Sequence, residues 1–367
     1  MHIIQVSSYY PPHLGGQENA VQSLATHLAR AGHAVDVITS TQGGASKGIT
    51  IEDNVCVTRL PGFVFGHAPI MPAFFNTLSS LIQPGSVVHL HIGQAFTPEM
   101  VYFLAKFRSF RYIAELHIDF EPSGPAGILL PLYKRLLLRP VLRAAAVVAV
   151  LNQKTQRIIQ SKYNLQDVQI LNNGIDEGYF DLRRPKFSEK PPAKLKLLFV
   201  GRLSKQKNIP CLLKALTKTR RNVHLDILGA GEEENDIKNI IKSYQLEKKV
   251  TLHGRVARSQ VMTFYKQSHV LLMPSLYEAQ PLVLLEAMAA RIPIIGTNVT
   301  GVAEHIQGIG IITPPTSDGL AKAIDEYYTQ YASLPAMVQK GYKKARMLGW
   351  PKLLNKYEKL YESILAD

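Results

Sequence analysis

The chain alternates short apolar runs with amphipathic stretches, which is the pattern of strands alternating with helices. Near the start, HIIQVSS predicts a strand and AVDVITS predicts the next one. Between them, NAVQSLATHLARAGH has helical periodicity and a glycine near its end. Strands this apolar are typical of a parallel sheet that helices cover on both faces. The first 40 residues therefore predict one βαβ unit.

The same alternation continues and predicts two domains. Further strands are predicted at SVVHLHI, RYIAELHI and AAVVAVL, before a charged, proline-rich segment at 183–194 that is typical of a linker. After it, the predicted strands are KLLFVGR, VHLDILGAG, VTLHGRV, HVLLMPS, IPIIGTN and GIGIITP. A chain of 367 residues also suits two domains better than one core. We expect two doubly wound α/β domains of the Rossmann type, over residues 1–185 and 186–350.

Composition narrows the class of protein. Hydrophobic residues make up 46% of the chain, but the longest apolar run, 144–151, is far shorter than the ~20 residues of a membrane span. The N-terminus has no basic leader before an apolar core, so we expect no signal peptide. Cys56 and Cys211 lack the spacing of a disulfide framework or a zinc site. We expect a cytoplasmic globular protein with two small buried thiols.

The net charge of +14 favours anionic partners. Residues 1–180 carry 13 Lys/Arg and 11 Asp/Glu, whereas the remainder carries 29 and 17. Phosphorylated ligands, nucleic acid and an anionic membrane all fit such a charge, and so does a solvated basic surface without a partner. No nucleic-acid-binding signature occurs in the sequence. Nucleic acid is therefore the least favoured partner.

Ligands of open α/β sheets bind beyond the carboxyl ends of the strands, next to helix N-termini. The first such loop, HLGGQE at 13–18, lacks a dinucleotide or Walker spacing, but Gly15 and Gly16 let backbone N–H groups approach a phosphate. A simple tight turn explains it equally well. In the second, FVGRLSKQKNI, a strand ends at Gly201 and is followed by Arg202 and Lys207. These two cations fit a diphosphate, although solvated surface cations are the alternative.

The third loop is LYEAQ, which joins HVLLMPS to the apolar helix PLVLLEAMAAR. Pro281 suits the first turn of that helix, whose N-terminus presents free N–H groups and the positive end of the helix dipole. Glu278 lies in the loop beside that end. Glu286 lies one turn inside the apolar helix, where a buried carboxylate needs hydroxyl or cationic partners. The two hydroxyls of a ribose would supply them.

Together these motifs resemble a retaining glycosyltransferase of family 4. The resemblance rests on the E-x7-E spacing of Glu278 and Glu286, the GR…K element, the paired glycines and NGID at 173–176, and it extends over almost the whole chain. It implies the GT-B architecture, in which two Rossmann-like domains face each other across a cleft. The C-terminal domain would bind the nucleotide sugar and the N-terminal domain the acceptor. The resemblance also implies that 351–367 forms a helix that crosses back to the N-terminal domain.

The resemblance also implies a role for each matched residue. Arg202 and Lys207 would hold the donor diphosphate, with Gly201 beside them, and Glu286 would bind the ribose hydroxyls. Glu278 and the backbone of Ala279, Gln280, Pro281 and Leu282 would face the donor sugar and phosphate. His117, in ELHID, would lie near the reaction centre, although the residue alone fits a core histidine. The remaining implied donor residues are Gly15, Gly16, which would let the N-terminal loop close over the diphosphate, and Gly229, Gly231 and Arg255 on the nucleotide side.

Three departures from the family pattern leave the sugar undetermined. Ala279 and Gln280 stand where Gly followed by Phe or Ser is common, and Gln280 would change which sugar hydroxyls are read. Asn172 replaces a usual proline, and Val302 replaces a common glycine.

The implied activity is transfer of a hexose-type sugar, with retention, from a nucleotide-diphosphate donor such as a UDP-sugar to an acceptor hydroxyl. Glycan, glycolipid or cell-surface polysaccharide assembly would use such a step. No Asp-x-Asp pair occurs, so we expect neither a metal nor another cofactor. The alternatives left open are a phosphorylase or nucleotide-sugar epimerase of the same fold, transfer to a soluble small molecule, and a non-enzymatic sugar-nucleotide or polyanion binder.

Two segments of the N-terminal half combine apolar and basic residues. They are 102–112, with Lys106, Arg108 and Arg111, and 131–146, with Lys134, Arg135, Arg139 and Arg143. Helices packed on a sheet explain such a pattern, and so does peripheral attachment to the anionic inner face of a membrane. In the second case the acceptor would be lipid-linked.

Overall fold

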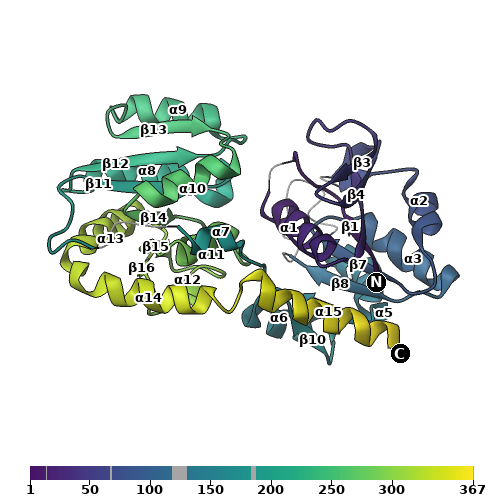
Figure 1. Cartoon of the computed structure of the whole chain (residues 1–367). Helices are drawn as coiled ribbons and strands as arrows, with labels where there is room; N and C mark the ends of the chain where they lie inside the picture. Colours follow the sequence, from purple (N-terminus) through teal and green to yellow (C-terminus); the bar gives the residue numbers. More distant parts are fainter. Residues whose placement is uncertain (14, 67, 118–129, 183–186, 367) are drawn as a thin grey trace. The chain divides into compact units, whose positions relative to one another are not determined.

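The computed structural model describes residues 1–13, 15–66, 68–117, 130–182 and 187–366. The chain divides into two compact units (Figure 1). Met1–Gly174 and Trp350–Asp367 form unit 1, and Ile175–Gly349 form unit 2. The division between the units, after Gly174, therefore comes before the boundary expected at 185/186. That expected boundary lies in the stretch 183–186, outside the described residues.

Unit 1 is built on an eight-stranded sheet with the order β10-β9-β8-β7-β1-β2-β4-β3. Its strands are parallel except for β3, which runs antiparallel to β4. They are β1 (His2–Ser7), β2 (Ala34–Ser40), β3 (Gly48–Glu52), β4 (Val55–Leu60), β7 (Ser86–Ile92), β8 (Tyr112–Leu116), β9 (Val147–Val150) and β10 (Val168–Ile170). A separate hairpin joins β5 (Phe63–Phe65) to β6 (Ala68–Ile70).

Helices cover both faces of this sheet. They are α1 (Gly16–Arg30), α2 (Phe74–Leu81), α3 (Thr97–Arg108), α4 (Leu130–Tyr133), the π-helical η2 (Lys134–Leu138), α5 (Arg139–Ala144), α6 (Gln153–Tyr163) and α15 (Trp350–Ala366). Because side chains alternate along a strand, Val88, Leu90 and Ile92 of β7 join the apolar core under α2, α3, α5 and α6. His89 and His91 point to the opposite face, where α1 and α15 contact each other.

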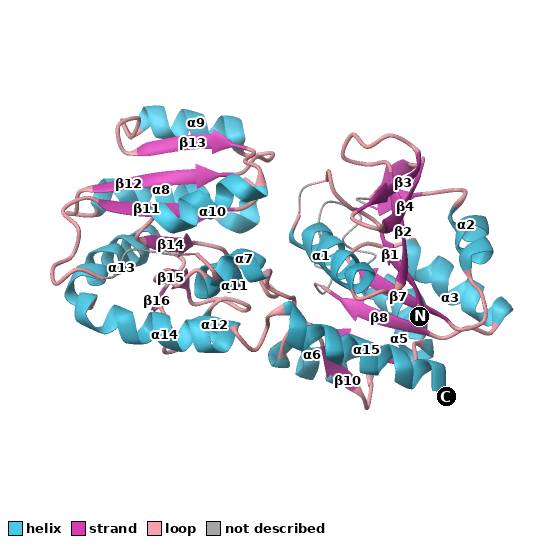
Figure 2. Ribbon diagram, in the orientation of Figure 1, coloured by secondary structure: helices cyan, strands magenta, loops and turns pink. Residues whose placement is uncertain are grey.

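Unit 2 has a six-stranded sheet with the order β13-β12-β11-β14-β15-β16, all parallel (Figure 2). This is the strand order of a Rossmann fold. The strands are β11 (Leu195–Val200), β12 (Val223–Leu228), β13 (Val250–Gly254), β14 (Val270–Met273), β15 (Ile294–Thr297) and β16 (Ile311–Thr313). The predicted class, α/β with two Rossmann-like domains, is therefore confirmed.

The helices of unit 2 form two separate layers, each with its own apolar cluster. The layer around α8 and α13 packs on Leu197, Phe199 and Leu225, whereas the layer around α10 and α11 packs on Leu198 and Leu271. The helices are α7 (Glu177–Phe180), η3 (Lys205–Lys207), α8 (Ile209–Lys218), α9 (Glu234–Ser243), α10 (Arg258–Gln267), α11 (Leu282–Ala289), α12 (Ala303–Ile306), α13 (Ser317–Thr329), η4 (Tyr331–Ser333) and α14 (Leu334–Ala345).

The last helix, α15, packs on unit 1 although it follows unit 2 in the sequence. The buried Trp350 ring stacks on His27 with 4.6 Å between the ring centroids, and its Nε1–H donates to Ser23 Oγ over 2.9 Å. Further along, Glu358 Oε1 lies 2.9 Å from His33 Nε2. None of the helices in the described part of the chain is long and apolar enough to cross a membrane.

We predict that Gly174→Ala destabilises unit 1. A Cβ atom at this position would lie 2.3 Å from Cε2 of Trp350, so the buried indole must move. Overpacking of this kind costs about 1–3 kcal/mol of unfolding free energy. Trp350 is the single tryptophan of the chain, so its fluorescence during urea unfolding reports this unit. The matched control is Gly16→Ala, where a Cβ meets nothing within 4 Å. Equal unfolding midpoints for both variants would contradict the prediction.

Candidate active site

The candidate site of unit 2 lies where the strand order reverses, between β11 and β14. Chains leaving these two strands turn to opposite sides, which opens a ligand crevice at their carboxyl ends in doubly wound sheets. The loop after β11 carries Gly201, Arg202 and Lys207, and the loop after β14 carries Glu278. The fold therefore brings together two motifs that lie about 70 residues apart in the sequence.

Lys207 and Glu278 are in direct contact. Lys207 Nζ lies 2.5 Å from Glu278 Oε1, and these side chains are only 15% and 7% exposed. Ser275 Oγ donates to the same carboxylate oxygen over 2.7 Å, and Gln206 Nε2 donates to Oε2 over 3.4 Å. Without a ligand, the ammonium is thus balanced by Glu278. A diphosphate that binds Lys207 must share or replace this carboxylate.

Arg202 is held much more loosely. Its Nε lies 3.1 Å from Glu232 Oε2, and the two side chains are 50% and 53% exposed. Exposed pairs of this kind contribute little, about 0–1 kcal/mol. A phosphate can therefore take the guanidinium from Glu232 at small cost, which fits the predicted role of Arg202.

The glycines after β11 and β12 allow the two strand ends to approach closely. A Cβ on Gly229 would lie 1.9 Å from the carbonyl oxygen of Gly201, and one on Gly231 would lie 2.3 Å from that of Leu203. Neither position accepts a side chain without movement of the backbone. Arg255 directly follows β13, at the same carboxyl edge of the sheet, and is exposed.

The loop before α11 is fixed by the chain that follows β15. Glu278 N–H donates to Thr300 O over 3.0 Å, and a Cβ on Gly301 would lie 2.1 Å from Glu278 O. Pro281 is the N-cap of α11, without a side-chain cap, and Gln280 is 4% exposed. Since proline has no N–H, the amides that this turn can offer to a ligand come from its neighbours Ala279, Gln280 and Leu282.

Glu286 receives hydroxyl partners from the chain itself. Tyr265 OH donates to Glu286 Oε2 over 3.0 Å, and burial raises the pKa of Glu286 although Arg258, Tyr265 and Tyr179 lower it. Arg258 is also paired with Asp176. The sequence analysis expects a ribose to satisfy this carboxylate, whereas the structure already provides tyrosine donors. The ribose contact stays a prediction, and a sugar hydroxyl would join or replace these donors.

His305 supports the same turn from α12, and the sequence analysis does not predict it. Its ring is buried and interacts with the backbone of Ala279. Burial, followed by the charge of Lys344, lowers the pKa of His305 to about 4, so the ring is neutral at physiological pH. The AEHI segment gives no sign of this contact, because it depends on how α12 folds back against the loop.

In unit 1, His117 follows β8 and is 6% exposed. His117 Nε2 lies 3.0 Å from His91 Nδ1 and 3.8 Å from Glu115 Oε1. Burial lowers the pKa of His117, while the Glu115 charge partly offsets this effect. The structure thus places His117 in a buried polar cluster rather than in an apolar core. Residues 118 and 119 of ELHID lie outside the described residues.

The glycine loop of unit 1 contains a carboxylate. Glu18 packs so closely on Gly15 that a Cβ there would lie 1.9 Å from Glu18 Oε2. His13 Nδ1 lies 2.7 Å from Glu18 Oε1. Gly16 begins α1, and Leu14 lies outside the described residues. A diphosphate next to Gly15 would meet the Glu18 charge, which His13 screens only when it is protonated.

Among the described residues, His89, His91 and Glu115 have ligand atoms within 4.8 Å of one another, close enough to share a metal ion. All three are buried. The sequence analysis expects no metal, and the donor set itself fits either a metal ion or a hydrogen-bonded cluster.

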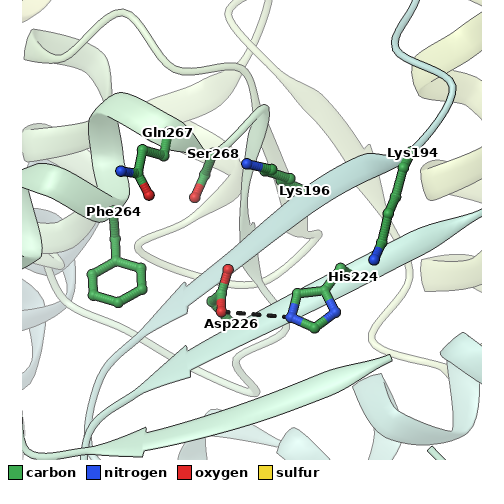
Figure 3. A pocket seen from close by; sticks show the side chains of 7 residues that line it. All are labelled: Lys194, Lys196, His224, Asp226, Phe264, Gln267 and Ser268. Carbon is green, nitrogen blue, oxygen red and sulfur yellow. Dashed lines mark ion pairs between the residues drawn. The ribbon is translucent and has the colours of Figure 1, made fainter. Parts of the chain in front are cut away.

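A pocket of about 200 Å³ lies elsewhere in unit 2 (Figure 3). It is lined by Lys194, Lys196, His224, Asp226, Phe264, Gln267 and Ser268. Lys196 and His224 stand near the amino ends of β11 and β12, and Asp226 Oδ1 lies 2.7 Å from His253 Nε2. Because doubly wound sheets bind ligands at the carboxyl ends, this pocket is separate from the candidate site.

Two family models match the sequence. The model for glycosyl transferases group 1 matches residues 182–344, and the model for glycosyltransferase family 4 matches residues 14–179. Together they span most of the chain. Among curated proteins, the gpi3 subunit of phosphatidylinositol N-acetylglucosaminyltransferase from Schizosaccharomyces pombe is 23% identical and covers 99% of this chain and 80% of its own length. A glycogen synthase of Mycobacterium tuberculosis is 25% identical and covers 83% of this chain and 80% of its own length.

Solved structures show the same fold. Sucrose-phosphate synthase from Thermosynechococcus elongatus superimposes with a TM-score of 0.79 at 20% identity, covering 100% of this chain and 99% of its own. Anabaena HepE in complex with UDP-glucose gives a TM-score of 0.78 at 16% identity, covering 99% of this chain and 100% of its own. The chain is therefore a glycosyltransferase of the GT-B fold and belongs to family 4.

Proposed function

We propose that this glycosyltransferase transfers a hexose-type sugar from a UDP-sugar to an acceptor hydroxyl with retention of configuration. The observation that carries the proposal is the contact between Lys207 and Glu278 at the point where the strand order of unit 2 reverses. An ammonium suits the diphosphate of such a donor, and the adjacent carboxylate suits the hydroxyls of its sugar.

The relatives support the choice of donor and acceptor class. HepE was crystallised with UDP-glucose, and a pneumococcal O-GlcNAc transferase with the same fold was crystallised with UDP and GlcNAc. The relatives from Schizosaccharomyces pombe and human are named as N-acetylglucosaminyltransferases that act on phosphatidylinositol. By analogy with the two crystallised enzymes, we propose a UDP-sugar as the donor of this chain. By analogy with the two phosphatidylinositol enzymes, we propose a lipid-linked acceptor.

The site stabilises a leaving nucleotide by electrostatics. As the bond to the sugar breaks, negative charge grows on the diphosphate, and Arg202, Lys207 and the N-terminus of α11 are positive groups on this edge of the sheet. These groups can carry the charge without a metal ion. In the proposed retaining reaction, the acceptor hydroxyl approaches from the face that the nucleotide leaves, and a donor phosphate oxygen helps to accept its proton.

A surface of unit 1 fits attachment to an anionic leaflet. Helix α3 contacts both η2 and α5, and α4 contacts η2; together these helices expose five large apolar side chains: Phe103, Phe107, Leu132, Leu136 and Leu137. The cations Lys106, Arg108, Arg111, Arg135 and Arg143 are exposed on the same helices or directly after α3. Lys134, which the sequence analysis places among these cations, is instead buried and cannot contribute.

We expect Lys207→Ala and Arg202→Ala each to lower turnover of the UDP-sugar about 10²–10³-fold, the usual loss when one group that stabilises transition-state charge is removed. Lys205→Ala is the matched control, because Lys205 lies in the same short helix η3 but is exposed. Assays with donor alone, with phosphate and with acceptor also separate transfer from phosphorolysis and epimerisation. Near-normal rates in both site variants would refute the diphosphate assignment.

Glu286→Gln should weaken UDP binding about 10-fold or more, since a hydrogen bond to a charged group contributes about 1.5–3 kcal/mol. Folding raises the pKa of Glu286, so the folded protein binds the carboxyl proton of Glu286 more tightly than the unfolded chain does. Stability therefore falls as pH rises above about 4.3, and the variant should lack this loss.

Calorimetry with UDP and thermal unfolding between pH 4 and 8 measure both effects of Glu286→Gln. Glu247→Gln, an exposed carboxylate of unit 2, is the control. Unchanged UDP affinity would remove Glu286 from the nucleotide site.

The full chain should sediment with anionic vesicles at low salt and be released at about 0.5 M salt, where the Debye length is roughly 4 Å. Replacing Phe103 and Phe107 with serine should abolish sedimentation, because these side chains are 42% and 77% exposed. The control replaces Ile49 and Ile51 of β3, which are 70% and 79% exposed, with serine. If the wild type stays in solution with anionic vesicles at low salt, the membrane attachment is refuted and a soluble acceptor is favoured.

A further inference from the structure

One face of the unit 1 sheet carries three buried side chains of types that often bind metal ions. They are His89 and His91 of β7 and Glu115 of β8, and each is at most 1% exposed. His89 and His91 stand two positions apart on one strand, and the strand register pairs His91 with Glu115, so all three point to the same face. One ligand atom from each residue lies within 4.8 Å of the other two.

The distances between these atoms fit a shared metal ion. His89 Nε2 lies 2.9 Å from Glu115 Oε2, and His91 Nδ1 lies 3.6 Å from the same oxygen. Ligand atoms that each lie about 2.0–2.1 Å from a tetrahedral Zn²⁺ are roughly 3.3 Å apart. The two observed separations lie on either side of this value. Small side-chain shifts would therefore let one ion contact all three residues.

Two of these atoms have no hydrogen bond that a metal ion would have to replace. Among the residues that the structure describes, His89 Nε2 and Glu115 Oε2 are buried atoms without a hydrogen-bond partner. Their mutual 2.9 Å contact lacks the alignment of a hydrogen bond. Buried polar atoms are rarely left unpaired in folded proteins. A cation between the nitrogen lone pair and the carboxylate would satisfy both atoms at once.

The other nitrogen of His89 faces a hydroxyl from the last helix. Tyr361 OH of α15 lies 2.9 Å from His89 Nδ1. A histidine that binds a metal through one ring nitrogen usually donates from the other to an oxygen atom, which fixes the orientation of its ring. The contact between His89 Nδ1 and Tyr361 fits this arrangement, because it leaves Nε2 as the ligand atom on the side of the carboxylate.

We propose that His89, His91 and Glu115 bind one Zn²⁺ ion that joins β7 to β8 and, through the hydroxyl of Tyr361, supports the packing of α15. Two imidazoles and a carboxylate are a ligand set of Zn²⁺, whereas Mg²⁺ and Ca²⁺ prefer oxygen atoms alone. A water molecule or His117 Nε2, which lies 3.0 Å from His91 Nδ1, would supply the fourth ligand.

The role of this ion is structural, and it belongs to unit 1 and not to the donor site of unit 2. A metal here departs from the expectation drawn from the sequence, in which His89 and His91 are only part of a predicted strand. Neither the site nor its test depends on the proposed transfer reaction.

The test uses the full-length chain without a histidine tag, equilibrated with Zn²⁺ or Co²⁺ and then freed of loosely bound metal. We expect about one metal ion per chain by elemental analysis. After removal of the metal with a chelator, free Zn²⁺ at about 100 times its Kd should raise the midpoint of thermal unfolding by about 5 °C or more. The fluorescence of Trp350, at the start of α15, follows this transition.

Variants separate this site from metal bound elsewhere. His91→Gln and Glu115→Gln each remove a ligand and should lower the Zn²⁺ affinity about 100-fold or more. Tyr361→Phe removes only the hydroxyl next to His89 and should lower the affinity about 10-fold or more. The matched control is Tyr357→Phe, which removes another buried hydroxyl of α15 and should keep the wild-type affinity.

A second control is His33→Gln. His33 Nε2 lies 2.9 Å from Glu358 Oε1 of α15, so this variant also weakens the packing of the helix without removing a ligand. It should bind Zn²⁺ as tightly as the wild type does. Loss of metal from both control variants would show that any damage to α15 releases the ion, which would overturn the specific role of Tyr361.

A wild-type chain that holds no stoichiometric metal after equilibration with Zn²⁺ and Co²⁺ would overturn the proposal, and the three side chains would then form a hydrogen-bonded cluster. An affinity that His91→Gln and Glu115→Gln leave unchanged would also overturn it, because the ion would then bind elsewhere. If these two variants fail to fold, the metal content of the wild type and the affinity of Tyr361→Phe decide the question. Absence of transferase activity would refute the proposed function and leave the metal result standing.

Discussion

Both units depend on one constraint of parallel sheets, which is the point where the strand order reverses. The reversal lies between β1 and β7 in unit 1 and between β11 and β14 in unit 2. Loops that follow such strands meet at one edge of the sheet, so residues distant in the sequence become neighbours there. Lys207 and Glu278 meet in this way.

Both candidate sites satisfy their charges within the chain. Lys207 is paired with Glu278, Arg202 with Glu232, and His13, when protonated, with Glu18. Such pairs hold the side chains in place before a ligand arrives, which limits the reorganisation needed during the reaction. They also set a condition for binding, since a diphosphate must exchange partners with these carboxylates. The exposed Arg202 pair exchanges at lower cost than the half-buried Lys207 pair.

Sequence patterns were enough for the class of fold, because apolar strands and amphipathic helices alternate along the whole chain. They failed for β3 and β5, whose residues are largely exposed, for the three-residue strands β6 and β10, and for β4, which is largely buried. In the candidate site, motif spacing identified Lys207 and Glu278 but could not pair them. The sequence did not predict the roles of Ser275, Tyr265 and His305, because these roles come from contacts made in the folded chain rather than from sequence motifs.

Glu115 and Glu286 show how the same residue type acquires different properties. Glu115 is surrounded by imidazole rings, which can turn an N–H toward it, and its pKa lies below the ordinary value. Burial raises the pKa of Glu286 above the ordinary value, although the charge of Arg258 and the hydroxyls of Tyr265 and Tyr179 act to lower it. A carboxylate whose pKa is lowered keeps its charge at neutral pH, whereas one that accepts from hydroxyls can exchange them for those of a ligand. The environment, and not the glutamate itself, therefore separates the two.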